Sequence, residues 1–144
     1  MLIEKSFSID CAHCLELPYE SKCQNLHGHT YKVTLVLEGE PNGRTGIVVD
    51  YTKFPKELIM QMDHKFLVAE RHTSEDNSGS VGILIDQVAL TLPERSVYII
   101  PGISNTTAEE LSRYIYGLVK SSGFTGLLAV RVKETEATEA TYNE

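Results

Sequence analysis

The stretch Tyr31–Glu38 (YKVTLVLE) decides the fold, because its side chains alternate in character along the chain. One set of alternate positions is apolar throughout, at Val33, Leu35 and Leu37. A period of two residues is typical of a β-strand that buries one face. The stretch therefore predicts a strand, which ends in the turn residues of 39–46.

The segment Cys23–His29 (CQNLHGH) stands just before this strand. Its two histidines, His27 and His29, are two positions apart, so on an extended chain both imidazoles project from the same side. If His13 comes from a neighbouring strand, three nitrogen ligands leave a fourth position open, which is the arrangement of a catalytic zinc site. Isolated histidines are commonly surface or core residues, and it is the joint spacing that favours a metal here. Cys23 is then the reactive group beside the metal.

Length and charge narrow the class of protein. A chain of 144 residues is most simply one domain, over residues 1–144, with room for a sizeable core. The net charge of −7 argues against nucleic acid or an anionic membrane as the main partner, because both are bound through clustered Lys and Arg. The N-terminus does not resemble a signal peptide and no apolar run approaches roughly 18 residues, so we expect a cytoplasmic protein without a membrane span.

Periodicity and capping signals predict an α+β fold. The expected elements are strands over 2–9 (continuing toward His13) and 31–38, helices over 52–62 and from the capping sequence 106–110 to Gly123, and strands over 127–133 and 137–142. Two helices then cover one face of an antiparallel sheet. The segment 69–101 between the helices predicts a mobile loop over 75–80 and a hairpin that pairs 81–89 with 97–100.

Two further motifs carry candidate chemistry, although each alone is commonly a solvated surface feature. Asp63 precedes His64 at the expected end of the first helix, and a carboxylate that orients an imidazole prepares it to carry protons near neutral pH. Glu134 closes the strand that begins at Leu127. A carboxylate there can accept two N–H bonds from a guanidine-like ring edge, which is what a pterin or guanine offers.

Cys11 and Cys14 form a C-x-x-C motif, which leaves a redox or thiolate zinc site as an alternative. On a strand, however, Cys11 shares a face with His13 while Cys14 faces away. No second C-x-x-C completes a four-thiolate site, which disfavours this alternative, and we expect the three cysteines to be free thiols or metal ligands and not disulfides.

In combination, these motifs resemble the 6-pyruvoyl-tetrahydropterin synthase and 6-carboxy-tetrahydropterin synthase family. The matching blocks are Phe7–His13, Cys23–His29 with Tyr31, Gly46–Tyr51, Asp63–His64 with Leu67, Thr106–Glu109 and Val132–Thr135. The resemblance implies a tunnelling fold (T-fold), an antiparallel four-stranded sheet with two helices on one side. It also implies that three subunits join their sheets into a barrel and that two trimers stack into a homohexamer.

The resemblance also implies roles for the site residues. The zinc ligands are His13, His27 and His29. The catalytic residues are Cys23, as the base that abstracts a proton, and Asp63 with His64, as a relay that reaches the site across a subunit boundary. The pterin ring is anchored by Glu134, helped by Thr106 and Thr107.

The implied substrate is 7,8-dihydroneopterin triphosphate, from which zinc and Cys23 remove a side-chain proton before triphosphate leaves. A pyruvoyl synthase stops there, whereas a carboxy synthase also releases acetaldehyde on the way to queuosine-type deazapurines. We expect the carboxy enzyme. The alternatives are a pyruvoyl synthase, a divergent pterin side-chain enzyme, or a zinc-containing pterin- or purine-binding protein without catalysis.

The chain departs from the family pattern in three places. Val68 and Glu110 stand where the family often has Asn, and the segment 69–101 exceeds the short connection of compact bacterial members. We expect this insert to cover the mouth of the site. The basic residues that could offset the acidic charge near a triphosphate are Lys22, Lys32, Arg71 and Arg131.

Overall fold

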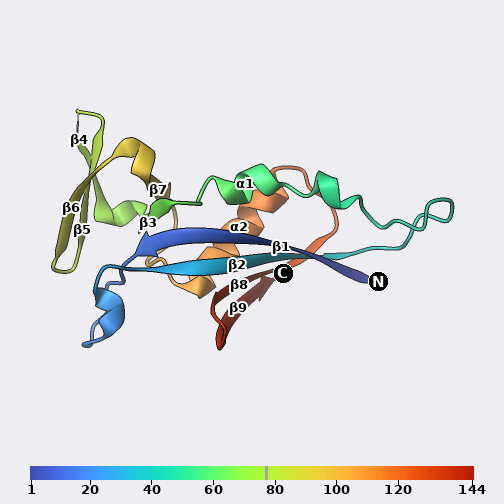
Figure 1. Ribbon diagram of the computed structural model, residues 1–144, viewed down its shortest axis with the longest axis horizontal. Helices are drawn as coiled ribbons and strands as arrows, with labels where there is room; N and C mark the ends of the chain where they lie inside the picture. The colour runs from blue at the N-terminus through green and yellow to red at the C-terminus, as the bar shows by residue number, and fades with distance from the viewer. Residues whose placement is uncertain (77) are drawn as a thin grey trace.

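The centre of the main sheet is a long antiparallel pair of strands, β1 (Leu2–His13) and β2 (His27–Glu38), which crosses the middle of the molecule (Figure 1). The computed structural model describes residues 1–76 and 78–144. β8 (Leu127–Thr135) pairs antiparallel with β2, and β9 (Thr138–Asn143) pairs antiparallel with β8. These strands confirm the predicted four-stranded antiparallel sheet of an α+β fold.

Two parallel strands extend this sheet beyond β1. They are β3 (Lys65–Ala69) and β7 (Val97–Ile100), and the strand order is β7-β3-β1-β2-β8-β9. The prediction that 97–100 pairs with 81–89 was therefore wrong. The physical reason lies in β3, where Phe66–Ala69 are all buried. A strand buried on both faces is an interior strand, and β7 supplies the partner on its open edge.

Between β3 and β7 the chain builds a separate three-stranded antiparallel sheet, at the upper left of Figure 1. Its strands are β4 (Thr73–Asp76), β5 (Ser80–Ile85) and β6 (Val88–Pro93), with η3 (Glu70–His72) before them and η4 (Glu94–Ser96) after them. The hairpin of the insert thus falls within 80–93. The predicted loop over 75–80 is strand at both ends, and its Asn77 lies outside the described residues.

The helix α2 (Ala108–Ser121) covers one face of the main sheet, behind β1 and β2 in Figure 1. The predicted capping sequence starts it, since the Thr107 hydroxyl accepts a hydrogen bond from the Glu110 backbone N. Its buried stripe joins the core with the inward residues of β1, β2 and β8, among them Leu111, Ile115, Val119, Phe7, Val33, Leu35 and Val132. No helix among the described residues is long and apolar enough to span a membrane.

The predicted helix over 52–62 was too long. The structure has a 3₁₀ turn, η2 (Tyr51–Lys53), followed by the short helix α1 (Lys56–Met60). Pro55 occupies the cap position between them and has no N–H to donate, so a continuous helix does not form through it. Beyond α1 the backbone of His64 takes a left-handed φ of 60°, which ends helical geometry before β3.

Candidate functional site

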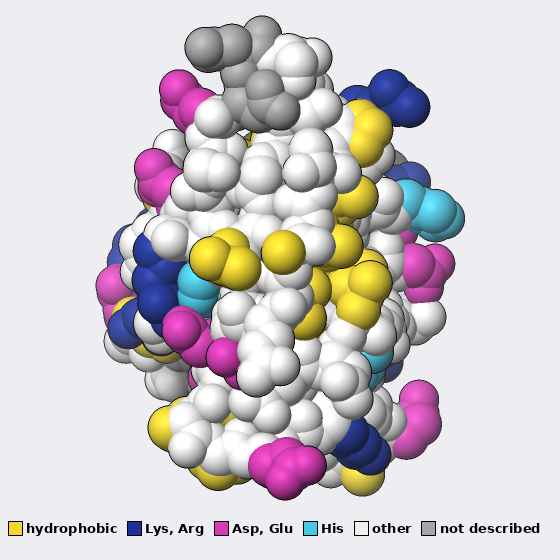
Figure 2. Space-filling view, turned by 90° about the vertical axis from the view of Figure 1, so that its left-hand side faces the viewer, with side chains coloured by type: hydrophobic (Ala, Val, Ile, Leu, Met, Phe, Trp, Pro, Cys, Tyr) yellow, Lys and Arg dark blue, Asp and Glu magenta, His cyan; other side chains and the backbone are white. Residues whose placement is uncertain are grey.

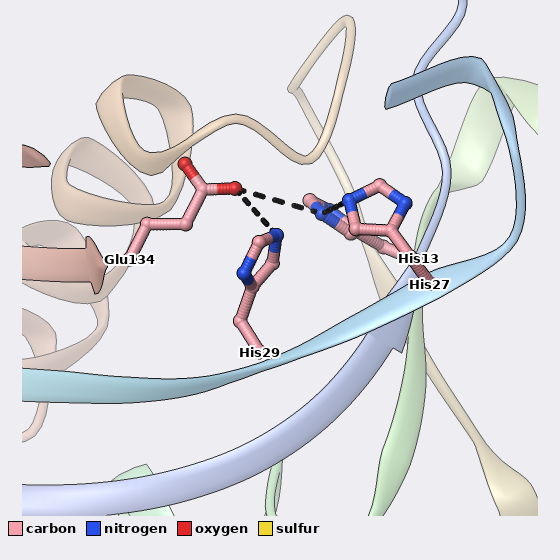
Figure 3. A group of neighbouring side chains, drawn as sticks. All are labelled: His13, His27, His29 and Glu134. Carbon is pink, nitrogen blue, oxygen red and sulfur yellow. Dashed lines mark hydrogen bonds and ion pairs between the residues drawn. The ribbon is translucent and has the colours of Figure 1, made fainter. Parts of the chain in front are cut away.

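The three predicted metal ligands meet at one end of the β1–β2 pair. The strand register sets His13 opposite His27, and Cys11 opposite His29. Alternate residues share a face of a strand, so the three imidazoles lie on the same side of the sheet, as Figure 3 shows. One atom from each imidazole and a carboxylate oxygen of Glu134, at the end of β8, lie within 4.8 Å of one another.

Hydrogen bonds on the far side of two rings fix which nitrogen carries the proton. Nδ1 of His13 lies 3.0 Å from the carbonyl oxygen of Thr106, and Nδ1 of His27 lies 2.6 Å from that of Asn25. A carbonyl oxygen only accepts, so both Nδ1 atoms donate and both Nε2 atoms of the neutral rings carry lone pairs. These Nε2 atoms are 3.1 Å apart. Two nitrogen ligands of a tetrahedral zinc ion, each bonded at ~2.0 Å, lie about 3.3 Å apart.

The third imidazole, that of His29, also has a nitrogen atom placed to bind a cation. Nε2 of His29 is buried and makes no hydrogen bond among the described residues, although Oε1 of Glu134 lies 2.8 Å away. The same oxygen lies 3.8 Å from Nε2 of His13. A divalent cation would satisfy the orphaned nitrogen, the facing lone pairs and the carboxylate together. Three imidazoles are a donor set that suits zinc, so the residues present fit this ion.

The surroundings of His13 and His29 favour the neutral form of both rings. The pKa of His13 is lowered to about 4, chiefly by burial and then by the neighbouring imidazoles of His27 and His29. Burial also lowers the pKa of His29, against the opposing effect of the Glu134 carboxylate. At neutral pH the close contact of His29 with Glu134 is therefore not an ion pair. Neutral imidazole is the form that binds a metal ion.

The two threonines expected beside the pterin are both engaged within the chain. The carbonyl and hydroxyl oxygens of Thr106, a buried residue, each lie 3.0 Å from Nδ1 of His13. Thr107 caps α2. Sequence reasoning missed the contact of Thr106 with His13, which joins residues 93 positions apart. The part of both threonines in pterin binding stays a prediction.

Tyr31 is a second contact of the site for which the sequence predicted no role. It is fully buried, and its hydroxyl lies 3.3 Å from Nε2 and 3.4 Å from Nδ1 of His13. Burial, followed by the charge of Glu134, raises the pKa of the phenol, so Tyr31 stays a neutral hydroxyl. Its position two residues after His29 was the signal, because it puts the ring on the face of β2 that carries the ligands.

Cys23 lies on the short helix η1 (Lys22–Gln24), ahead of β2. Its backbone N donates to the hydroxyl of Ser21 in a capping box, and its carbonyl oxygen accepts a hydrogen bond from the backbone N of Leu15. These bonds tie η1 to the chain that leaves β1 just after His13. Among the described residues no thiol belongs to the histidine donor group, so the geometry gives Cys23 no place as a ligand.

Asp63 and His64 form a hydrogen-bonded pair that is anchored on β1. Nδ1 of His64 lies 2.9 Å from Oδ2 of Asp63, whose Oδ1 accepts from the backbone N of Asp10 at 2.8 Å. The pKa of Asp63 is lowered, chiefly by that backbone hydrogen bond, and the pKa of His64 is raised by its hydrogen bond to Asp63. The pair is thus an oriented imidazole that holds its proton more firmly than a lone histidine, which suits proton transfer.

Within one chain this pair forms a donor group with Asp10 that is separate from the histidine cluster. Asp10 is exposed and alternates with the buried Cys11, so it lies on the opposite face of β1 from His13. His64 lines a groove of about 650 Å³ on that face. Other lining residues come from the sheet and from β6, and include Asp10, Ala12, Gly28, His29, Leu90 and Leu92. Figure 2 faces the end of the molecule that carries β4, β5 and β6, and it shows hydrophobic side chains gathered across the middle of that end.

The structure gives no support to a C-x-x-C site. Cys11 packs in the main core, where its thiol donates to the carbonyl oxygen of Met62 at 3.1 Å, while Cys14 packs in the small core beneath β5. Burial raises the pKa of the Cys11 thiol to about 12. Both are free thiols without thiolate character.

Two of the four basic residues proposed to meet a triphosphate are already paired. Arg71 forms an ion pair with Glu16, and Arg131 forms one with Glu4. The charges of these two arginines are therefore partly neutralised by ion pairs within the chain.

Comparison with known proteins gives a family match over nearly the whole chain. The profile of a family described as 6-pyruvoyl tetrahydropterin synthase matches residues 2–144. A protein of Pyrococcus abyssi, provisionally named 6-carboxy-5,6,7,8-tetrahydropterin synthase, is 38% identical over 127 residues, which cover 88% of this chain and 78% of its own. The 6-carboxy-5,6,7,8-tetrahydropterin synthase of Haemophilus influenzae is 29% identical over 149 residues, which cover 99% of this chain and 98% of its own.

A solved structure has the same fold. The 6-pyruvoyltetrahydropterin synthase of Plasmodium vivax superposes with a TM-score of 0.78 at 21% identity, covering 100% of this chain and 98% of its own. This likeness confirms the expected tunnelling fold.

Proposed function

The chain belongs to the 6-pyruvoyl tetrahydropterin synthase family, and on that premise we propose that it is a zinc-dependent lyase acting on 7,8-dihydroneopterin triphosphate. We favour the 6-carboxy-5,6,7,8-tetrahydropterin synthase reaction, because the Pyrococcus abyssi and Haemophilus influenzae relatives carry that name. The reaction would release triphosphate and acetaldehyde, and its product would enter queuosine-type deazapurine biosynthesis.

The observation that carries the proposal is the donor group of His13, His27 and His29. In His13 and His27 a hydrogen bond from Nδ1 leaves the lone pair of Nε2 available to a metal ion. Nε2 of His29 is buried without a hydrogen bond among the described residues. All three would hold zinc. When bound there, zinc supplies Lewis-acid and templating chemistry at the oxygens of the substrate side chain.

The remaining roles belong to side chains around this group. Cys23, as a thiolate, would take the side-chain proton, and His64, oriented by Asp63, would carry protons as the side chain rearranges. Glu134 would accept N–H bonds from the edge of the pterin ring. One of its carboxylate oxygens points away from the imidazoles in Figure 3 and is the atom we assign to that contact.

We further propose that the working site forms between subunits of a homohexamer built as a dimer of trimers. The support is the placement of His64 on the face of β1 opposite to that of His13. A chain that carries both groups on opposite faces can complete each site only with a second copy. Asp63 and His64 would then serve the histidine cluster of a neighbouring chain.

Product analysis tests the proposed reaction. Zinc-loaded protein is incubated with 7,8-dihydroneopterin triphosphate, and the pterin, the phosphate species and any aldehyde are identified. We expect 6-carboxy-tetrahydropterin, triphosphate and acetaldehyde. Release of triphosphate without acetaldehyde would replace the carboxy assignment by a 6-pyruvoyl synthase, and release of neither would overturn the lyase.

Cys23 separates an enzyme from a zinc-containing pterin- or purine-binding protein, because a binder has no use for the thiol. Cys23→Ala should abolish turnover while zinc content and pterin affinity stay close to those of the wild type. Cys14→Ala, which removes a thiol in the small core, is the matched control and should keep turnover in the protein that folds. Turnover that survives Cys23→Ala would contradict the assigned mechanism.

A further inference from the structure

The loop that enters α2 holds the ligand His13 in place. Thr106, the second residue before α2, presents its carbonyl oxygen to Nδ1 of His13 at 3.0 Å. Because this contact fixes the proton on Nδ1, it leaves the lone pair of Nε2 directed at the donor group. The position of the Thr106 carbonyl thus matters to the metal site, and something must hold the loop there.

The side chain of Asn105 holds the loop by a two-point clamp on Glu16. Its Oδ1 accepts a hydrogen bond from the backbone N of Glu16 at 3.1 Å, and its Nδ2 donates to the backbone carbonyl oxygen of Glu16 at 2.7 Å. One amide group thereby satisfies both backbone groups of a single residue. Glu16 lies three residues beyond His13, so the clamp joins the loop to the chain that carries the ligand.

The insert supplies a third point of attachment. Nε of Arg71, on η3, donates to the carbonyl oxygen of Ser104 at 2.8 Å, and its guanidinium also pairs with the carboxylate of Glu16. The buried ring of His72 contacts the same carboxylate, with Nε2 and Oε2 2.9 Å apart. The end of β1, the start of the insert and the loop before α2 therefore meet in one hydrogen-bonded network.

We propose that Asn105 is a positioning residue for the metal ligand His13, acting through Thr106, and that Arg71 supports it from the insert. The inference rests on the proposed zinc site. Arg71, which belongs to the insert, would then support the metal site and would not contact a triphosphate. Asn105 itself touches neither zinc nor substrate; it sets where the Thr106 carbonyl meets the imidazole.

The test compares Asn105→Ala with the wild type in zinc affinity, measured by competition with a chromophoric chelator, and in the visible absorption spectrum of the Co²⁺-substituted protein. Removing an outer partner of a metal-binding histidine typically costs 10–100-fold in metal affinity, so we expect about a tenfold loss and an altered Co²⁺ spectrum. Wild-type zinc affinity and an unchanged Co²⁺ spectrum in Asn105→Ala would overturn the inference, even if its melting temperature fell.

Asn42→Ala is the matched control. The Asn42 side chain also binds backbone N–H groups, those of Arg44 and Thr45, but in the 39–46 turn at the far right of Figure 1. It should bind zinc as the wild type does. If Asn105→Ala does not fold, Arg71→Gln replaces it, because this half-exposed side chain can be changed at little structural cost. We expect weaker zinc binding there too, and no change would count against the inference.

The same experiment separates the inference from the function on which it rests. A wild-type protein that binds no zinc overturns both. Tight zinc binding by the wild type and by Asn105→Ala alike overturns the inference alone.

Discussion

An imidazole has two nitrogen atoms, and the partner of one decides what the other can do. In His13 and His27 a backbone carbonyl holds Nδ1, which leaves Nε2 directed at the cluster with His29 and Glu134. In His64 the same nitrogen meets the carboxylate of Asp63, and the side chain is 77% exposed. Under the proposed function, one residue type would therefore serve as a ligand in one place and as a proton carrier in another, according to its neighbours.

Asp63→Asn should lower the pKa of His64 toward its ordinary value of 6.5, because the hydrogen bond to the carboxylate is the main cause of its rise. An NMR titration of the His64 ring signals measures this. Since the folded pKa is raised, the stabilisation from the pair is fully present below the unfolded pKa and is lost as the pH rises through the folded one. Because the pair also requires ionised Asp63, whose pKa is lowered from 3.8, the variant should lose most stability, relative to the wild type, between about pH 3.8 and 6.5.

Asp50→Asn is the control for this titration, since Asp50 caps η2 and is not among the groups that shift His64. It should leave the pKa of His64 as it is in the wild type. A pKa of His64 that does not move in Asp63→Asn would remove the assigned coupling.

At the scale of elements, the sequence predicted correctly the features that depend on spacing along a single strand. The spacing of His27 and His29 predicted their shared face, because alternation along a strand needs no knowledge of the rest of the chain. The contact of Thr106 with His13 was hidden, since it depends on how a distant loop packs. The spacing of Phe54 and Met62 fits a helix, yet Pro55 divides the segment into a 3₁₀ turn and the short helix α1.

For the strands as well, the sequence predicted the element correctly but not its pairing partner. Apolar residues at 97–100 predicted a strand correctly, but the sequence could not say whether β5 or β3 would be its partner. That choice depended on the open edge of the buried strand β3, which exists only once the sheet is assembled.

Thr107→Ala should destabilise the protein by about 1 kcal/mol, because it removes the N-cap of α2 while leaving an unpaired N–H at the helix start. The melting temperature measures this loss. Thr107→Ser keeps a hydroxyl in place and should restore most of it. If Thr107→Ala melts like the wild type but binds pterin poorly, its hydroxyl serves the substrate and the cap is unimportant.

At the scale of the whole molecule, the sheet separates two halves of the proposed chemistry. His13 faces the side covered by α2, whereas His64 lines the groove on the other side, toward β6. In the proposed hexamer, the His64 of one chain would serve the histidine cluster of a neighbouring chain.

Subunit mixing tests this arrangement. Cys23→Ala and His64→Ala chains, each inactive alone, are refolded together, and we expect roughly a quarter of the wild-type activity, because random assembly gives that share of sites two intact partners. A mixture of Cys23→Ala with the double variant Cys23→Ala/His64→Ala cannot form an intact site and is the control. Mixed assemblies without any recovered activity would show that each chain uses its own His64.

The most direct test of the account is the zinc stoichiometry and first coordination shell of the protein and of its His13→Ala, His27→Ala and His29→Ala variants, measured by metal analysis and X-ray absorption. We predict one zinc per wild-type chain, bound by nitrogen and oxygen without sulfur, and loss of stoichiometric zinc in each variant. Sulfur in the first shell, or full zinc content in the three variants, would contradict it.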